Sequence, residues 1–251
     1  ARHLAERSRV IEEDLRRAID VERFLLPEPR VEGAGWAIEH VYRPVEHLGG
    51  DFVDVQRRPN DGWAVLLADV SGHGTTAALT SVMTKTSFMR AIASADSPGT
   101  VLAAMDAELS QVVPPGQFVT AQVLFLRPDL GKATIASAGH PYPLLLRNDF
   151  AEVVETHNGP PLLVEHDAHY PDMDLRHLHA GESILLYTDG AIEAADDQHQ
   201  RLRIEGLRSL AALPRNAGDS VVHTLLKEVL THARSRLNDD VALLSAQCCA
   251  R

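Results

Sequence analysis

The sequence predicts a single α+β domain, rich in strands, that follows a helical N-terminal extension. Residues 1–27 are rich in Arg and Glu, and the predicted helix ends at Pro27 and Pro29. From residue 30 to 247, short apolar runs that end at Gly or Asp are interspersed with longer segments of helical spacing. No internal repeat or Ser/Gly linker divides this stretch. We therefore expect a helical linker over the first segment and one domain over residues 28–251.

The individual elements follow from the spacing of apolar residues and from turn signals. The run from Trp63 to Val70 is almost entirely apolar, which is typical of a strand buried on both faces. The segment from Pro128 to Gly131 predicts a hairpin turn. We expect strands over residues 36–42, 63–70, 118–126, 132–137, 141–147, 183–188 and 241–247. We expect helices over residues 75–94, 204–213 and 220–236.

The N-terminal helix carries a weak heptad pattern. Apolar residues recur every seven positions, at Leu4, Ile11, Ala18 and Leu25. Of the three seam positions between them, Ser8, Leu15 and Glu22, only one is apolar. The pattern alone leaves open both a coiled coil and a helix packed on its own domain.

The charge and the cysteine content exclude several classes of protein. The formal net charge is −11, from 24 Lys and Arg against 35 Asp and Glu, and such an acidic surface repels nucleic-acid phosphates. No apolar run approaches the roughly 18 residues of a membrane span. The only cysteines, Cys248 and Cys249, are adjacent, which disfavours a disulfide between them. We therefore expect a cytoplasmic protein that binds no nucleic acid and has no membrane span.

Several aspartates lie where a predicted apolar segment meets a turn, namely Asp51, Asp69, Asp189, Asp239 and Asp240. Ionised carboxylates gathered at one buried point repel one another strongly, and a divalent cation reverses that balance. A set of ligands with oxygen atoms only favours Mg²⁺ or Mn²⁺ over zinc. Asp and Gly also mark ordinary turns, and the spacing alone leaves both interpretations open.

Five short motifs follow one another along the chain, and together they are far more specific than any one alone. They are Gly49-Gly50-Asp51-Phe52, Asp69-Val70-Ser71-Gly72-His73-Gly74, Ala138-Gly139-His140-Pro141, Leu186-Tyr187-Thr188-Asp189-Gly190 and Asn238-Asp239-Asp240-Val241. On these motifs the sequence resembles the bacterial PPM-type serine/threonine phosphatases of the SpoIIE/RsbU class, relatives of the eukaryotic PP2C enzymes. The resemblance covers about residues 20 to 247. It implies two packed antiparallel β-sheets flanked by helices (αββα), preceded by the helical extension.

The resemblance also implies two Mn²⁺ or Mg²⁺ ions, with a third, weaker ion in some members. The ligands that it implies are Asp69 as the bridging residue, the carbonyl of Val70, Asp189, Asp239 and Asp51. Asp240 is expected to contact these ligands rather than a metal ion. A water that bridges the two ions attacks the phosphorus of phosphoserine or phosphothreonine, and Asp69 and Asp189 act through this water.

The motifs do not identify the residue that donates a proton to the leaving seryl or threonyl oxygen. The eukaryotic relatives have a His two residues after the bridging Asp, and this position is Ser71 here. His73 and His140 are the nearby candidates. A structural role for each histidine, with solvent water as the donor, is the alternative.

The resemblance further implies partners. Phosphatases of this class often follow a sensor domain through a helix that dimerises, and their usual substrates are phosphorylated anti-sigma-factor antagonists of stress and sporulation pathways. The absence of an initiator Met and the heptad agree with an upstream sensor and a homodimer.

Three other functions compete with this interpretation. One is a catalytically silent phosphatase-like domain that binds a partner and relays a signal. Another is a structural scaffold that holds no metal. A diguanylate cyclase is rejected, because the second acidic residue of its Gly-Gly-Asp/Glu-Glu-Phe loop is absent after Asp51.

Overall fold

The structure is a computed structural model. It describes residues 17, 19–20, 24–45, 49–59, 62–72, 74–128, 131–147, 150–214 and 218–249. None of the helices in these ranges combines the length and the apolar character that a membrane span requires.

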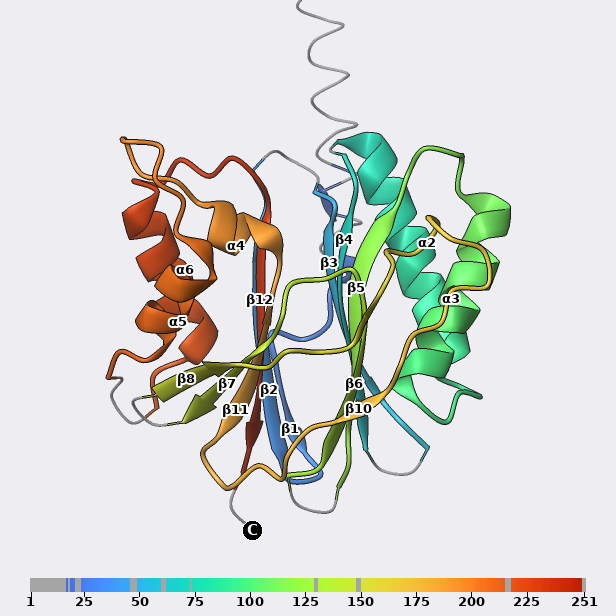
Figure 1. The fold of residues 1–251 in the computed structure, drawn as a ribbon, viewed down its shortest axis with the longest axis horizontal. Coiled ribbons are helices and arrows are strands. Elements are labelled where there is room, and N and C mark those ends of the chain that lie inside the picture. Colours follow the sequence, from blue (N-terminus) through green and yellow to red (C-terminus); the bar gives the residue numbers. More distant parts are fainter. Residues whose placement is uncertain are drawn as a thin grey trace, which may run out of the picture.

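The fold is a sandwich of two β-sheets between two layers of helices (Figure 1). The first sheet has the spatial order β1 (Arg30–Gly33), β2 (Trp36–Arg43), β12 (Val241–Cys248), β11 (Ser183–Tyr187), β7 (Leu144–Arg147) and β8 (Phe150–Val153). The second has the order β10 (Met173–Asp174), β6 (Ala133–Ala138), β5 (Val119–Leu126), β4 (Trp63–Val70) and β3 (Asp51–Arg57), with β9 (Asn158–Gly159) beside β6. All neighbours are antiparallel except the short pair of β6 and β9.

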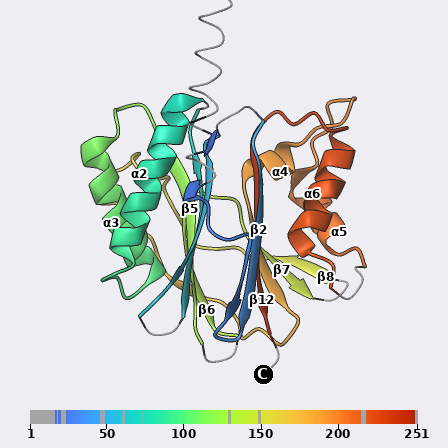
Figure 2. The same ribbon diagram turned by 180° about the vertical axis from the view of Figure 1, so that it is seen from behind.

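The helices divide between the two outer faces of the sandwich, as the view from behind also shows (Figure 2). The helices on the second sheet are α2 (Thr75–Ala91) and α3 (Pro98–Val112). Those on the first sheet are α4 (Asp189–Glu193), α5 (Arg203–Ala211) and α6 (Val221–His232). The expected αββα arrangement is therefore confirmed.

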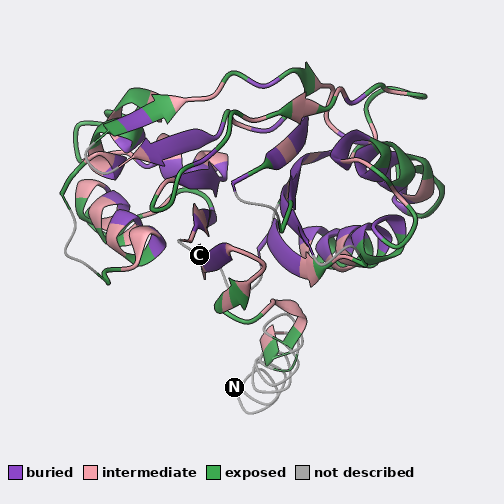
Figure 3. Ribbon diagram, turned by 90° about the horizontal axis from the view of Figure 1, so that it is seen from below, coloured by how far each residue is buried: buried purple, intermediate pink, exposed green. Residues whose placement is uncertain are grey.

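The alternation of side chains along the strands produces three apolar layers, and the central strands of both sheets are buried over most of their length (Figure 3). In β4, Val65 and Leu67 face the space between the sheets, whereas Leu66 and Ala68 pack under α2 and α3. Both sets are fully buried, as the apolar run of this strand predicts. The side chains that point between the sheets at the strand ends are polar, and these ends form the site described below.

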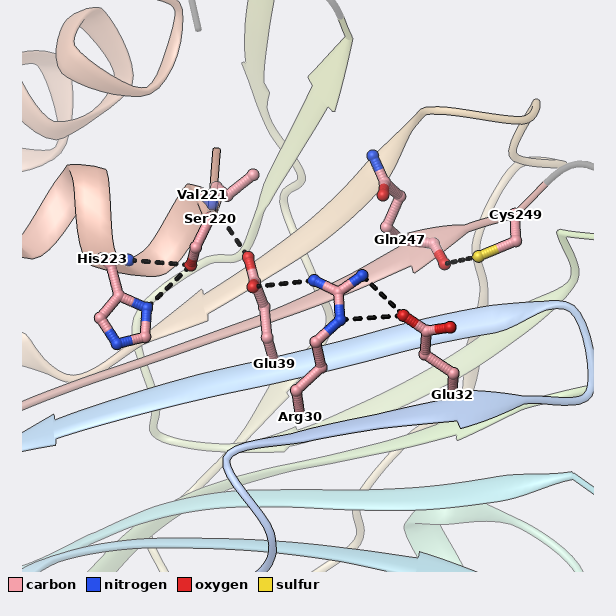
Figure 4. A network of polar contacts seen from close by, with 8 residues as sticks. All are labelled: Arg30, Glu32, Glu39, Ser220, Val221, His223, Gln247 and Cys249. Carbon is pink, nitrogen blue, oxygen red and sulfur yellow. Dashed lines mark hydrogen bonds and ion pairs between the residues drawn. The ribbon is translucent and has the colours of Figure 1, made fainter. Parts of the chain in front are cut away.

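Strand β1 and helix α6 are held to β2 by a polar network (Figure 4). Glu39 of β2 accepts a hydrogen bond from the backbone N–H of Val221, 2.9 Å away, at the start of α6. The same carboxylate pairs with Arg30 of β1 at 3.3 Å. Ser220 completes the cap of α6, because its Oγ accepts from the backbone N–H of His223. The segment that leads into the domain is thus attached to the first sheet.

The predicted strands and helices all occur, with small shifts at their ends. Strand β7 starts at Leu144 rather than at Pro141, because Pro141 and Pro143 have no N–H for the ladder. The N-terminal helix is described only in part, and Leu4, Ile11 and Ala18 lie outside the described residues. The heptad therefore remains a prediction, as does the domain boundary at residue 28.

Candidate active site

The first half of the site lies at one end of the second sheet. Asp51 opens β3 and Asp69 lies near the end of β4, and the two are direct cross-strand partners. Thr120 of β5 is the partner of Asp69 on its other side. Cross-strand partners point to the same face of a sheet, so these three side chains form a polar row toward the first sheet. Asp51 is buried and Asp69 is half-buried.

The second half of the site comes from β11 and β12 of the first sheet. Thr188 follows β11, and its hydroxyl donates a hydrogen bond of 2.6 Å to Oδ2 of Asp51. The hydroxyl oxygen of Thr188 in turn accepts from the backbone N–H of Ala242 at 2.9 Å. Asp189 follows directly and begins α4. One buried hydroxyl therefore joins the ends of β3, β11 and β12.

Asp240, which precedes β12, accepts hydrogen bonds from the backbone on both sides of the loop that precedes β3. Its Oδ1 accepts from the N–H of Val45 at 2.7 Å, and its Oδ2 accepts from the N–H of Gly50 at 2.9 Å. Both oxygens are thus occupied in positioning the loop that leads to Asp51. Asp239 is exposed, and its Oδ1 accepts from the backbone N–H of Asp240.

Three glycines provide the space for this convergence. A Cβ at Gly49 would lie 2.0 Å from Oδ2 of Asp240, and one at Gly50 would lie 2.6 Å from the carbonyl oxygen of Val70. A Cβ at Gly190 would lie 1.9 Å from the carbonyl oxygen of Asp240. Real Cβ atoms do not approach other atoms so closely, so glycine is required at these positions for steric reasons.

Burial and mutual repulsion raise the pKa values of three carboxyls. Burial and the charge of Asp69 raise the pKa of Asp51 well above its usual range, against the hydrogen bond from Thr188. The pKa of Asp69 is raised to about 7 by burial and by the charges of Asp189, Asp239 and Asp240. Burial and the charge of Asp239 raise the pKa of Asp189. Each of the five carboxyls therefore lies within electrostatic range of at least two of the others.

This set of donors fits a hard divalent cation. Its side-chain donors are carboxylate oxygens, and a cation would relieve the repulsion that raises their pKa values. Within the described ranges, however, no three histidine, cysteine, aspartate or glutamate side chains form a ready-made metal site. The individual ligand roles of Asp51, Asp69, Val70, Asp189, Asp239 and Asp240 therefore remain predictions.

The histidine candidates differ in what the structure describes. His73 lies outside the described residues. His140 is buried, and its Nδ1 lies 2.8 Å from the hydroxyl of Thr120. Ser71, in the position of the expected proton donor, instead accepts a hydrogen bond from the backbone N–H of Phe118 at 2.9 Å. Ser71 thus has a structural partner at the end of β4.

An ion pair that the sequence did not predict lies on the opposite face of β3. Asp54 is fully buried, and its Oδ1 lies 3.1 Å from Nζ of Lys85 on α2. One turn earlier on α2, the hydroxyl of Ser81 donates to the carbonyl of Gly50 at 3.0 Å. Helix α2 is therefore attached at two points to the strand that carries Asp51. Side chains alternate between the two faces of a strand, so Asp54 must point away from the face that carries Asp51 and toward the helices. This alternation could have indicated that Asp54 needs a partner in the helix layer.

The chain is similar to known protein families. The chain matches the family model of stage II sporulation protein E (SpoIIE) over residues 59–248. It is 27% identical over 187 residues to the phosphoserine phosphatase RsbP of Bacillus subtilis (strain 168), with 72% of this chain and 45% of RsbP covered. The chain therefore spans less than half the length of that relative.

Solved structures share the fold. The RsbU and RsbW domains of Rv1364c from Mycobacterium tuberculosis match with a TM-score of 0.73 and 30% identity, over 86% of this chain and 60% of that chain. The SiaA-PP2C domain of Pseudomonas aeruginosa matches with a TM-score of 0.80 and 18% identity, over 97% and 98% of the two chains. RsbX in complex with magnesium matches with a TM-score of 0.64 and 16% identity, over 87% and 98%.

Proposed function

Because the chain belongs to the SpoIIE family, we propose that it is a metal-dependent phosphoprotein phosphatase acting on phosphoserine and phosphothreonine. The observation that carries the proposal is the gathering of carboxyls from both sheets at one end of the sandwich, where burial and mutual repulsion raise the pKa values of Asp51, Asp69 and Asp189. The relative RsbP is named a phosphoserine phosphatase. A cluster of carboxylates that repel one another suits an enzyme that binds cations for phosphoryl transfer.

The metal ligands that we propose are those of the family resemblance. Asp51, Asp69, the carbonyl of Val70, Asp189 and Asp239 would hold two Mn²⁺ or Mg²⁺ ions, and a third, weaker ion is part of the same proposal. RsbX, which shares the fold, binds magnesium. Bound ions supply positive charge that lowers the pKa of the attacking water and stabilises the phosphoryl transition state.

The chain's own residues prepare the site for this chemistry. Thr188 orients the carboxylate of Asp51 by donating to its Oδ2. Asp240 accepts a hydrogen bond from the backbone N–H of Gly50, so it would position the neighbouring Asp51 without binding a metal itself. Metal binding favours the ionised form of Asp69, whose pKa is raised in the metal-free site.

We assign the substrate to the class of phosphorylated anti-sigma-factor antagonists, in a stress-response or sporulation pathway in the cytoplasm. This assignment rests on the family resemblance. By the same argument, residues 1–27 would connect the domain to an upstream sensor and form a homodimer. Charged residues at Leu4 and Ile11 should lower the mass seen by light scattering or change the activity, and no change in either would contradict this assignment.

Hydrolysis of a phosphoserine peptide and of an aryl phosphate tests the activity. We expect turnover with Mn²⁺ or Mg²⁺, none with a chelator, and a loss of about 100-fold or more in Asp189→Asn. Asp174→Asn is the matched control, because this exposed carboxylate lies on β10, where it accepts from Thr134. It should retain wild-type turnover.

The outcomes separate the proposal from its main alternative. Calorimetry with Mg²⁺ and Mn²⁺ measures binding independently of turnover. Metal binding without hydrolysis of any phosphoprotein, including the full-length protein's own antagonist substrate, would support the silent signalling domain. The absence of metal binding would contradict the carboxylate site itself.

A further inference from the structure

The motif around His140 is held rigidly in the turn after β6. Gly139 has a φ of 65°, a backbone conformation that favours glycine, and its N–H donates to the carbonyl of Gly159 at 2.9 Å. The carbonyl of His140 accepts from the side chain of Asn158 at 3.2 Å. The carbonyl of Pro141 accepts from Gln122 at 2.9 Å. The imidazole is therefore attached to a fixed backbone.

One side of the ring contacts the polar row of the second sheet. Nδ1 lies 2.8 Å from the hydroxyl of Thr120, and Thr120 is the cross-strand partner of Asp69. Thr120 and Asp69 point to the same face of the sheet. The ring thus supports the residue beside the predicted bridging ligand.

The other side of the ring faces the first sheet. Nε2 is buried and makes no hydrogen bond of good geometry to any residue that the structure describes. Burial lowers the pKa of His140 to about 3, against the nearby backbone of Tyr187, which favours the protonated ring. Tyr187 ends β11, two residues before Asp189. The ring therefore lies between the strand ends that carry Asp69 and Asp189.

We propose that His140 is a positioning residue, which as a neutral imidazole holds the ends of β5 and β11 at the separation that the metal site requires. Nδ1 contacts the hydroxyl of Thr120, and the buried Nε2 lies on the side of the ring that faces the first sheet. This inference rests on the proposed function. His140 would act on the metal ligands only indirectly, through Thr120 and Tyr187. This role also removes His140 from the candidates for the proton donor, because a buried neutral ring has no imidazolium proton to give at pH 7.

The affinity of the folded protein for Mg²⁺, measured by calorimetry, tests this proposal without reference to turnover. We expect His140→Ala and Thr120→Val each to weaken binding by about 10- to 100-fold, the usual effect of removing a group that supports metal ligands. Thr120→Ser keeps the hydroxyl and should bind as the wild type does. His166→Ala, at an exposed histidine, is the matched control.

The double variant and the pH profile distinguish positioning from proton donation. If the contribution of Thr120 depends on its contact with His140, the double variant of His140→Ala and Thr120→Val should bind Mg²⁺ no more weakly than His140→Ala alone. At saturating metal, the pH profile of His140→Ala should keep its shape. Unchanged affinity together with slower turnover of phosphoserine peptides, but not of an aryl phosphate with a good leaving group, would overturn the proposal in favour of proton donation.

Failure of this proposal is distinct from failure of the proposed function. Wild-type binding with unchanged affinity in Thr120→Val and His140→Ala overturns the positioning role alone. The absence of wild-type binding overturns both. Circular dichroism of each variant shows that it is folded, and Thr120→Val keeps the test valid where His140→Ala is unfolded.

Discussion

The buried ion pair between α2 and β3 provides the most quantitative test of the structure. Nζ of Lys85 lies 3.1 Å from Oδ1 of Asp54, and the two side chains are 13% and 0% exposed. The change Lys85→Met keeps an unbranched chain of similar length and removes the charge. It leaves the carboxylate of Asp54 buried without its cation.

The expected cost follows from what remains around this carboxylate. Removal of one partner from a buried ion pair costs about 3–5 kcal/mol. Oδ1 of Asp54 keeps hydrogen bonds of 2.9 Å from the backbone N–H of Val55 and from the side chain of Gln56. These donors still stabilise the charge, so we expect the lower end of the range, about 3 kcal/mol.

Urea denaturation of the metal-free protein at pH 7 measures this loss. Asp54→Asn in the Lys85→Met background should restore all but about 1 kcal/mol, because the amide oxygen accepts the same hydrogen bonds without a buried charge. Lys227→Met, at an exposed lysine on α6, is the matched control and should change stability by less than about 0.5 kcal/mol. A loss below about 1 kcal/mol in Lys85→Met, or no recovery in the double variant, would refute the reasoning.

Three further predictions concern the carboxylate site. Thr188→Val removes the donor to Asp51 and should weaken Mg²⁺ binding by about 10-fold or more in calorimetry. Gly190→Ala places a Cβ 1.9 Å from the backbone of Asp240, and activity assays with Mg²⁺ should show nearly complete loss. The raised pKa of Asp69, about 7, means that the metal-free folded state binds more protons than the unfolded chain between about pH 4 and 7. Thermal melts should therefore show that this group's contribution to metal-free stability declines as the pH rises through this window, and that added Mg²⁺ removes the decline.

Each of these predictions has its own control. Thr188→Ser keeps the hydroxyl and should restore most of the affinity. In Gly206→Ala the nearest atoms to the new Cβ belong to the flexible side chain of Leu202, and this variant should keep full activity. In Asp69→Asn, the pH dependence of the metal-free melting temperature should become shallower, and an unchanged slope would contradict the assignment.

The strands with strong apolar patterns were predictable from the sequence, whereas several polar, mixed or short elements, β3 and α3 among them, were not. The run from Trp63 to Val70 carries enough apolar residues to predict β4 directly. Strand β3 has Asp51 and Asp54 among its buried positions, so its pattern resembles a loop. Helix α3 begins at Pro98 after the cap Ser97, and the small residues that follow have weak helical periodicity. In both cases tertiary contacts determine the element.

For the site, the positions of the aspartates were predictable and their hydrogen bonds were not. The motifs place Asp51 and Asp189 at strand ends, where the structure has them. The role of Thr188 depends on a contact with Asp51 over a separation of 137 residues. The contact between Asp240 and Gly50 spans 190 residues. No local pattern encodes such pairs, because they arise from the packing of one sheet on the other.

The central place of β12 in the first sheet has a consequence for synthesis on the ribosome. This strand, the last in the chain, pairs with β2 on one side and with β11 on the other. Until it emerges, both neighbours present open edges that are prone to aggregation. Asp240, just before this strand, is also needed at Gly50. A nascent chain therefore holds no assembled site until nearly all of the domain has been translated, and a product terminated before β12 would lack the carboxylate site.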